Sequence, residues 1–173
     1  MRMIRNSLVG AAILVLGLGS GIAAWADHLK APAGEVILTV TGAISHTTDG
    51  QAAAFDLEGF EALGQSKFST STRWTEGVIE FSGVACKDLA AALGAGGKEV
   101  IATALNDYAS SVPMEIFSDP DCLIASRMDG KTMSIRDKGP LWVVFPYDKD
   151  SKFGDEIYQS TAVWQLKLLE FRN

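Results

Sequence analysis

Two short polar tracts carry the side chains best suited to chemistry in this sequence. Arg136-Asp137-Lys138 places a guanidinium, a carboxylate and an ammonium group ahead of an apolar run. Asn106-Asp107-Tyr108 follows another apolar run and offers an amide, a carboxylate and a phenol. A carboxylate can accept two hydrogen bonds from a cyclic amidine or guanidine-like edge, while the cations can bind carbonyl or phosphate oxygens. The tracts predict a site for a polar heterocycle or an anion, with a solvated charged turn as the simpler alternative.

Aromatic side chains lie close to polar residues of this kind. Trp74 is flanked by Thr75 and Gly77, and Tyr108 belongs to the second polar tract. Both rings are suited to stacking against a flat ligand, and the alternative is that they cap the hydrophobic core. Trp142 lies inside an apolar run, so we assign it to the core.

The sequence gives little support for a serine nucleophile or a zinc site. A serine nucleophile needs a base, usually histidine, and the sequence has only His28 and His46 and lacks a Gly-x-Ser-x-Gly elbow. Zinc would need about four ligands, and these two histidines lie far from the cysteines. Cys86 and Cys122 are the two cysteines, and their spacing leaves a disulfide and two buried thiols as open alternatives.

The N-terminal residues predict export. Arg2 and Arg5 precede an apolar run, which ends in small residues ahead of Asp27. This pattern is typical of a cleaved signal peptide over residues 1–26, with a retained membrane anchor as the alternative, and it predicts a periplasmic protein. The remaining 147 residues are enough for one domain, 27–173, and carry 13 basic and 21 acidic residues. A net charge of −8 without a basic cluster argues against nucleic acid as a partner.

The pattern of apolar residues predicts an α+β fold, in which strands dominate and short helices connect them. Asp56 is expected to cap a helix over 56–63, and Gly94 to end a helix over 87–93. Asp129-Gly130 predicts a hairpin. Strands are expected at 35–41, 68–72, 78–81, 100–105, 123–128, 141–145 and 163–171, and a turn or short helix at 113–117.

Several motifs together resemble the molybdopterin-binding domain of the sulfite oxidase type, and the small exported members of that superfamily most of all. The motifs are Phe81-Ser-Gly-Val84 with Asp88-Leu89, Ala104 to Tyr108, Asp129 to Lys131, and Arg136 to Trp142. Their order and spacing cover nearly all of residues 27–173. The resemblance implies a mixed sheet or barrel-like core around a cofactor pocket.

The resemblance also implies where a metal ligand would lie. In catalytic members a cysteine ligates molybdenum on the strand before the Phe-x-Gly-Val tract, whereas residues 68–74 here contain no cysteine. Cys86 comes after that tract, so the role does not transfer to it. Molybdenum is therefore not expected, because a thiolate is the ligand that fixes it in these enzymes.

The chain is similar to exported pterin-binding proteins that lack the metal and report to an inner-membrane diguanylate cyclase or phosphodiesterase. This similarity implies a periplasmic pterin-binding protein with such a cyclic-di-GMP signalling partner. Asp107 or Asp137 is expected to bind the amino-pyrimidinone edge. The alternatives are a molybdopterin-dependent oxidoreductase and an interaction module with an empty pocket. The predicted cofactor-binding residues are Trp74, Asn106, Asp107, Tyr108, Arg136, Asp137 and Lys138.

Overall fold

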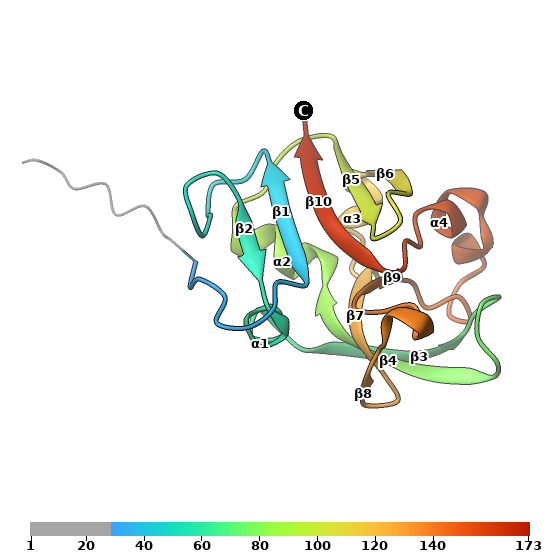
Figure 1. Cartoon of the computed structure of the whole chain (residues 1–173). Coiled ribbons are helices and arrows are strands. Elements are labelled where there is room, and N and C mark those ends of the chain that lie inside the picture. The colour runs from blue at the N-terminus through green and yellow to red at the C-terminus, as the bar shows by residue number, and fades with distance from the viewer. Residues whose placement is uncertain (1–28) are drawn as a thin grey trace, which may run out of the picture.

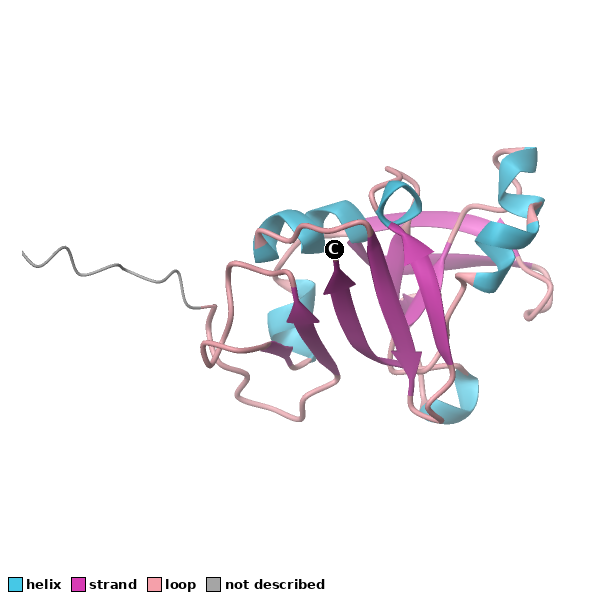
Figure 2. Cartoon of the chain, turned by 90° about the horizontal axis from the view of Figure 1, so that it is seen from above, coloured by secondary structure: helices cyan, strands magenta, loops and turns pink. Residues whose placement is uncertain are grey.

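Two five-stranded β-sheets organise residues 29–173, the part of the chain that the computed structural model describes (Figure 1). The predicted signal peptide, residues 1–26, lies outside the described residues. Short helices connect the strands, and Figure 2 shows them at the ends and margins of the sheets. The α+β class is confirmed, and the two sheets of residues 29–173 remain open and do not close into a barrel.

The first sheet has the strand order β2-β1-β10-β5-β6. β1 runs parallel to β10, and the other neighbours are antiparallel. The C-terminal strand β10 therefore lies at the centre of this sheet, between β1 from the N-terminal part of the domain and β5 from its middle (Figure 1). The bounds are β1 Leu38–Gly42, β2 Ala53–Phe55, β5 Glu99–Ala104, β6 Ala109–Pro113 and β10 Leu166–Arg172.

The second sheet has the strand order β3-β4-β7-β8, and β9 also pairs with β7. All of its pairings are antiparallel. β3 and β4 form a long hairpin whose connection, residues 72–77, lies at the outer end of the sheet (Figure 1). The bounds are β3 Ser66–Ser71, β4 Val78–Ala85, β7 Leu123–Met128, β8 Lys131–Thr132 and β9 Trp142–Val144.

Local sequence chemistry explains where the helices begin and end. The Asp56 side chain accepts a hydrogen bond from the Gly59 N–H at 2.8 Å, which confirms the predicted N-cap. Gly94 ends α2 in the left-handed conformation, as predicted. The bounds are α1 Leu57–Glu61, α2 Cys86–Leu93, α3 Met114–Phe117, α4 Glu156–Ser160, and the 3₁₀ helices η1 Ile135–Asp137 and η2 Ser151–Gly154.

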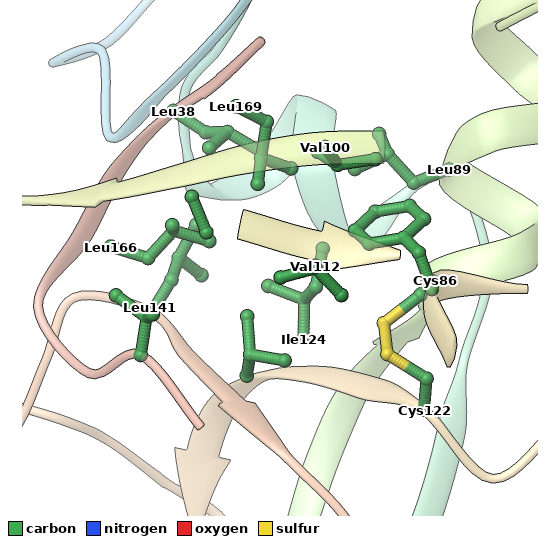
Figure 3. Packing of buried hydrophobic residues seen from close by; sticks show 14 of the residues in the cluster. Leu38, Cys86, Leu89, Val100, Val112, Cys122, Ile124, Leu141, Leu166 and Leu169 are labelled. Carbon is green, nitrogen blue, oxygen red and sulfur yellow. A yellow bond between two sulfur atoms is a disulfide. The ribbon is translucent and has the colours of Figure 1, made fainter. Parts of the chain in front are cut away.

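The main hydrophobic core lies between the two sheets (Figure 3). Val100 and Leu169 of the first sheet and Ile124 of the second are fully buried in it. Cys86 and Cys122 form a disulfide at its edge, which ties the start of α2 to the residue before β7. Of the two alternatives for the cysteines, the structure therefore has the disulfide.

A second, smaller cluster covers the opposite face of the second sheet. Side chains alternate along β7, so Ile124 faces the main core while Leu123 and Ala125 face this cluster. Trp142 is fully buried here, as the sequence predicted for a core residue. Trp74, Tyr147 and Trp164 pack against the cluster from outside. The aromatic residues of the candidate site thus rest on a packed sheet face.

The structure corrects several element boundaries. The closing strand begins at Leu166 instead of residue 163, because Gln165 has a left-handed backbone with φ 51°. The chain after the Asp129-Gly130 hairpin pairs for only two residues before it enters η1. Strands β2 and β6 and the helix α4 were not predicted, because their short sequences lack a clear apolar period. Among the described residues, no helix is both long and apolar enough to cross a membrane.

Candidate functional site

Three connections that are distant in sequence meet at a cavity of about 360 Å³. They are the tip of the β3–β4 hairpin, the β5–β6 turn, and the segment from α4 to β10. A cavity of this size falls in the range of small-molecule sites. Its lining consists of Trp74, Ala104, Asn106, Tyr108, Gln159, Ser160, Ala162, Val163 and Trp164.

The indole rings of Trp74 and Trp164 form part of the cavity lining and are inclined to each other at 60°. The ring centroids of Trp74 and Trp164 lie 5.6 Å apart. Trp74 also meets Trp142 and Tyr147, each at a centroid distance of 5.9 Å and with an edge-on orientation. Such contacts fix the rings in place, because aromatic pairs prefer edge-to-face geometry at these distances. The cavity therefore presents preformed aromatic surface to a ligand.

Local hydrogen bonds hold Trp74 at the hairpin tip. Its backbone N–H donates to the Thr72 hydroxyl at 3.0 Å, and that hydroxyl lies 2.8 Å from the hydroxyl of Thr75. Gly77 completes the turn with φ 67°, a conformation that favours glycine. The turn sequence thus positions the indole over the second cluster.

Lys138 lies next to the aromatic wall. Its ammonium nitrogen is 5.0 Å from the centroid of the Trp164 ring and 5.7 Å from that of Trp142, within the range of cation–π contacts. Its backbone is left-handed, and its carbonyl accepts a hydrogen bond from the Gln165 N–H at 2.8 Å. Lys138 and the segment that carries Trp164 are thereby joined directly.

The two predicted carboxylates are engaged elsewhere. Asp107 accepts a hydrogen bond from the Lys167 ammonium at 2.7 Å, and this bond lowers the pKa of the Asp107 carboxyl. The Asp137 carboxylate accepts from the Ser134 hydroxyl at 2.7 Å and helps to close η1. Neither residue lines the cavity, and Arg136 in the same helix is exposed to solvent.

Asn106 and Tyr108 both line the cavity, on the side of the β5–β6 turn. The Asn106 Oδ1 accepts a hydrogen bond from the Tyr108 N–H at 3.2 Å, so the amide NH₂ group is the end that points away from the backbone. The Tyr108 side chain is exposed at the mouth. The predicted residues that line the cavity are therefore Trp74, Asn106 and Tyr108, while Lys138 contacts the Trp164 ring and is not part of the lining.

Sequence reasoning missed six residues of the cavity lining, among them Trp164 and Gln159. Trp164 was included in a predicted strand, whereas it precedes β10 and forms a single bridge with Trp142. Gln159 lies in α4, which carries no recognisable site motif. Isolated aromatic and amide residues give no sequence signal that separates them from ordinary surface or core positions.

The tract from Phe68 to Trp74, where the resemblance implies a metal ligand in catalytic members, has other contacts here. The Ser71 hydroxyl donates to the Asp148 carboxylate at 2.6 Å. The cysteines are joined to each other and are at most 1% exposed. Within residues 29–173, no group of three or more histidine, cysteine, aspartate or glutamate side chains lies close enough to hold a metal ion.

Comparison with known proteins places these features in context. The family described as "Oxidoreductase molybdopterin binding domain" matches residues 47–148. The sulfane dehydrogenase SoxCD from Paracoccus pantotrophus has a similar structure, with a TM-score of 0.58 and 19% sequence identity over 78% of this chain. The match spans 37% of that neighbour's length, so the likeness concerns the fold alone. No curated protein matches the sequence.

Proposed function

The chain belongs to the oxidoreductase molybdopterin binding domain family, and we propose that the cavity lined by Trp74 and Trp164 binds the pterin ring system. The carrying observation is the preformed pair of indole rings beside an amide-bearing turn. A pterin is a flat heterocycle with donors and acceptors along one edge, which suits stacking combined with a few fixed polar contacts. The Lys138 ammonium is close enough to the Trp164 ring to bind a carbonyl or phosphate oxygen at the cavity's margin.

The metal-binding half of molybdopterin fits the chain less well than the ring. When bound, that cofactor supplies molybdenum redox chemistry, for which catalytic relatives provide a cysteine thiolate. Cys86 and Cys122 are buried and bonded to each other, so neither offers a thiolate to the cavity. Ser71, in the tract concerned, offers only a hydroxyl. We therefore favour a pterin-binding role without molybdenum chemistry.

The finer role that we propose is signalling. A periplasmic domain of this kind would present its bound pterin to an inner-membrane diguanylate cyclase or phosphodiesterase. The support is the predicted signal peptide and the resemblance to exported pterin-binding proteins. Cellular cyclic-di-GMP should change with pterin supply when this protein and its membrane partner are both produced, and should not respond when either is deleted. A response that survives loss of this protein contradicts the signalling role.

Molybdopterin-dependent oxidation is the second candidate, and the comparisons favour it. The family description names oxidoreductases, and the structural neighbour is described as a sulfane dehydrogenase. This candidate requires the metal to be held by ligands other than a protein thiolate. It predicts stoichiometric molybdenum in the protein after export.

One experiment distinguishes the candidates. The full chain is produced with its N-terminal segment, purified without added reductant, and divided for elemental analysis and acid extraction. A pterin identified by fluorescence and mass, without molybdenum, supports the proposed function. Molybdenum at about one atom per chain supports the oxidoreductase. Recovery of neither, together with no binding of added pterin, contradicts both and supports an interaction module.

A further inference from the structure

A second hollow, of about 680 Å³, borders the same β5–β6 turn as the candidate site. It is lined by residues 35–37 and 39, residues 133–135 and residues 167–168, together with Leu105 and Pro140. We call it the apolar groove. Leu105 lines the groove, whereas Asn106 and Tyr108 of the same turn line the cavity. A molecule in the groove therefore contacts the turn that also lines the candidate site.

Large apolar side chains lie exposed along this groove. Val36 is 47% exposed, Leu105 40% and Ile135 59%. They are three of the six large hydrophobic residues that are exposed within residues 29–173. Single exposed apolar side chains are ordinary, but several gathered around one hollow are typical of a protein interaction surface.

The charges beside the groove are opposite in sign to those of the chain as a whole. Residues 131–138 carry Lys131, Arg136 and Lys138 but only one carboxylate, and that carboxylate accepts a hydrogen bond from the Ser134 hydroxyl. Within residues 29–173, none of these three cations takes part in an ion pair. Residues 27–173 have a net charge of −8. An acidic partner surface would complement this segment and would be repelled by most of the remaining chain.

We propose that the apolar groove docks the membrane partner, through a segment of that partner that combines apolar and acidic side chains. The inference rests on the proposed signalling role and names the surface that serves it. A second copy of the chain fits the groove less well. Two copies meeting groove to groove would bring Arg136 and Lys138 close to their own equivalents, and each copy carries the same net negative charge.

Photochemical cross-linking in cells tests the contact. The full chain carries Ile135→p-benzoylphenylalanine and is produced with an epitope-tagged form of the membrane partner used in the cyclic-di-GMP experiment. Illumination should join the two proteins. The same photoreactive residue at the control position 78 should not, because Val78 is 66% exposed but lines neither the groove nor the cavity. Arg136→Glu in the same chain should lower the yield at position 135 several-fold by reversing a charge next to the groove.

A matched pair of charge substitutions tests the consequence. Ile135→Glu should weaken partner binding about tenfold or more, because it places a carboxylate in an apolar contact, and the cyclic-di-GMP response to pterin should be lost. Its affinity for 6-hydroxymethylpterin should stay unchanged, since Ile135 does not line the cavity. Val78→Glu adds the same charge at an exposed apolar residue and should keep both the response and the affinity. Thermal unfolding shows whether each variant is folded.

The outcomes separate this inference from the function on which it rests. If wild-type protein gives the cyclic-di-GMP response and folded Ile135→Glu gives the same response, the docking surface is wrong while the signalling role stands. If wild-type protein gives no response, the signalling role fails and the inference fails with it. A cross-link from position 135 that joins two copies of this chain, or equal loss of response in Val78→Glu, would also overturn the inference.

Discussion

Replacing Cys86 and Cys122 together with alanine is expected to lower the free energy of unfolding by about 4 kcal/mol. The disulfide closes a loop with a sequence separation of 36 residues. Cross-linking a loop of that length removes about 13 cal/mol/K of chain entropy from the unfolded state, which is about 4 kcal/mol at 25 °C. Because the two sulfurs sit at the edge of the main core, a small packing loss adds to this value.

Urea unfolding measures the effect. With a slope of about 2 kcal/mol per molar urea, the midpoint of the Cys86→Ala/Cys122→Ala variant should fall by about 2 M. Wild-type protein unfolded in the presence of reductant provides the control, because it loses the cross-link and keeps both side chains. A decrease below about 1 kcal/mol, or two titratable thiols in native protein purified without reductant, would refute the reasoning.

The same variant also tests the function. If the cysteines have no part in ligand binding, the folded double variant should retain its pterin content and affinity at a temperature where it is stable. A molybdenum ligand at Cys86 would give another result, since metal content would disappear with the cysteine. Loss of bound pterin from a folded variant would contradict the separation between the disulfide and the cavity.

Three further predictions concern the site and the fold. Trp164→Ala should weaken pterin binding about tenfold in a fluorescence titration by removing a stacking wall; unchanged affinity would move the ligand elsewhere. The Arg127 guanidinium donates hydrogen bonds to the Glu61 carboxylate and lowers its pKa below the ordinary value of 4.5. The pair therefore stabilises the protein above that pH, and this stabilisation is lost as the pH falls through the folded-state pKa. Glu61→Gln should therefore cost about 1 kcal/mol at pH 7 in urea unfolding and progressively less as the pH is lowered below 4.5; a difference that does not change with pH would exclude the ion pair as the cause. Gly83→Ala should destabilise the fold by about 3 kcal/mol or more, because its added Cβ would clash with the Ile124 carbonyl of the neighbouring strand; wild-type thermal stability would contradict this packing.

Features set by local chemistry could be predicted from the sequence. Asp56 caps α1 through the N–H three residues later, and Gly94 ends α2, because each effect involves residues within one helical turn. The Asp129-Gly130 hairpin returns antiparallel for the same reason, since both residues adopt the positive φ that such a turn requires. These elements needed no knowledge of distant contacts.

The roles of charged residues could not be predicted in the same way. Asp107 pairs with Lys167, which is 60 residues away in the sequence and reaches it only because β10 lies beside β5. The Asp137 carboxylate accepts a hydrogen bond from the hydroxyl of Ser134, the residue that precedes its own 3₁₀ helix. Sequence patterns identify a carboxylate but do not say which donor it meets in the folded chain.

The cavity combines side chains from three separate parts of the chain, and their positions depend on the folded backbone. Trp74 comes from one sheet's hairpin, Asn106 from the other sheet's turn, and Trp164 from the connection that leads into β10. The left-handed backbone of Gln165 ends the extended segment early, and the bridge between Trp164 and Trp142 then holds the indole beside the Trp74 ring. A continuous strand through residue 164 would instead commit that side chain to one face of the first sheet. The position of Trp164 in the cavity lining therefore depends on the left-handed backbone at Gln165, which the alternation of apolar residues in the sequence does not reveal.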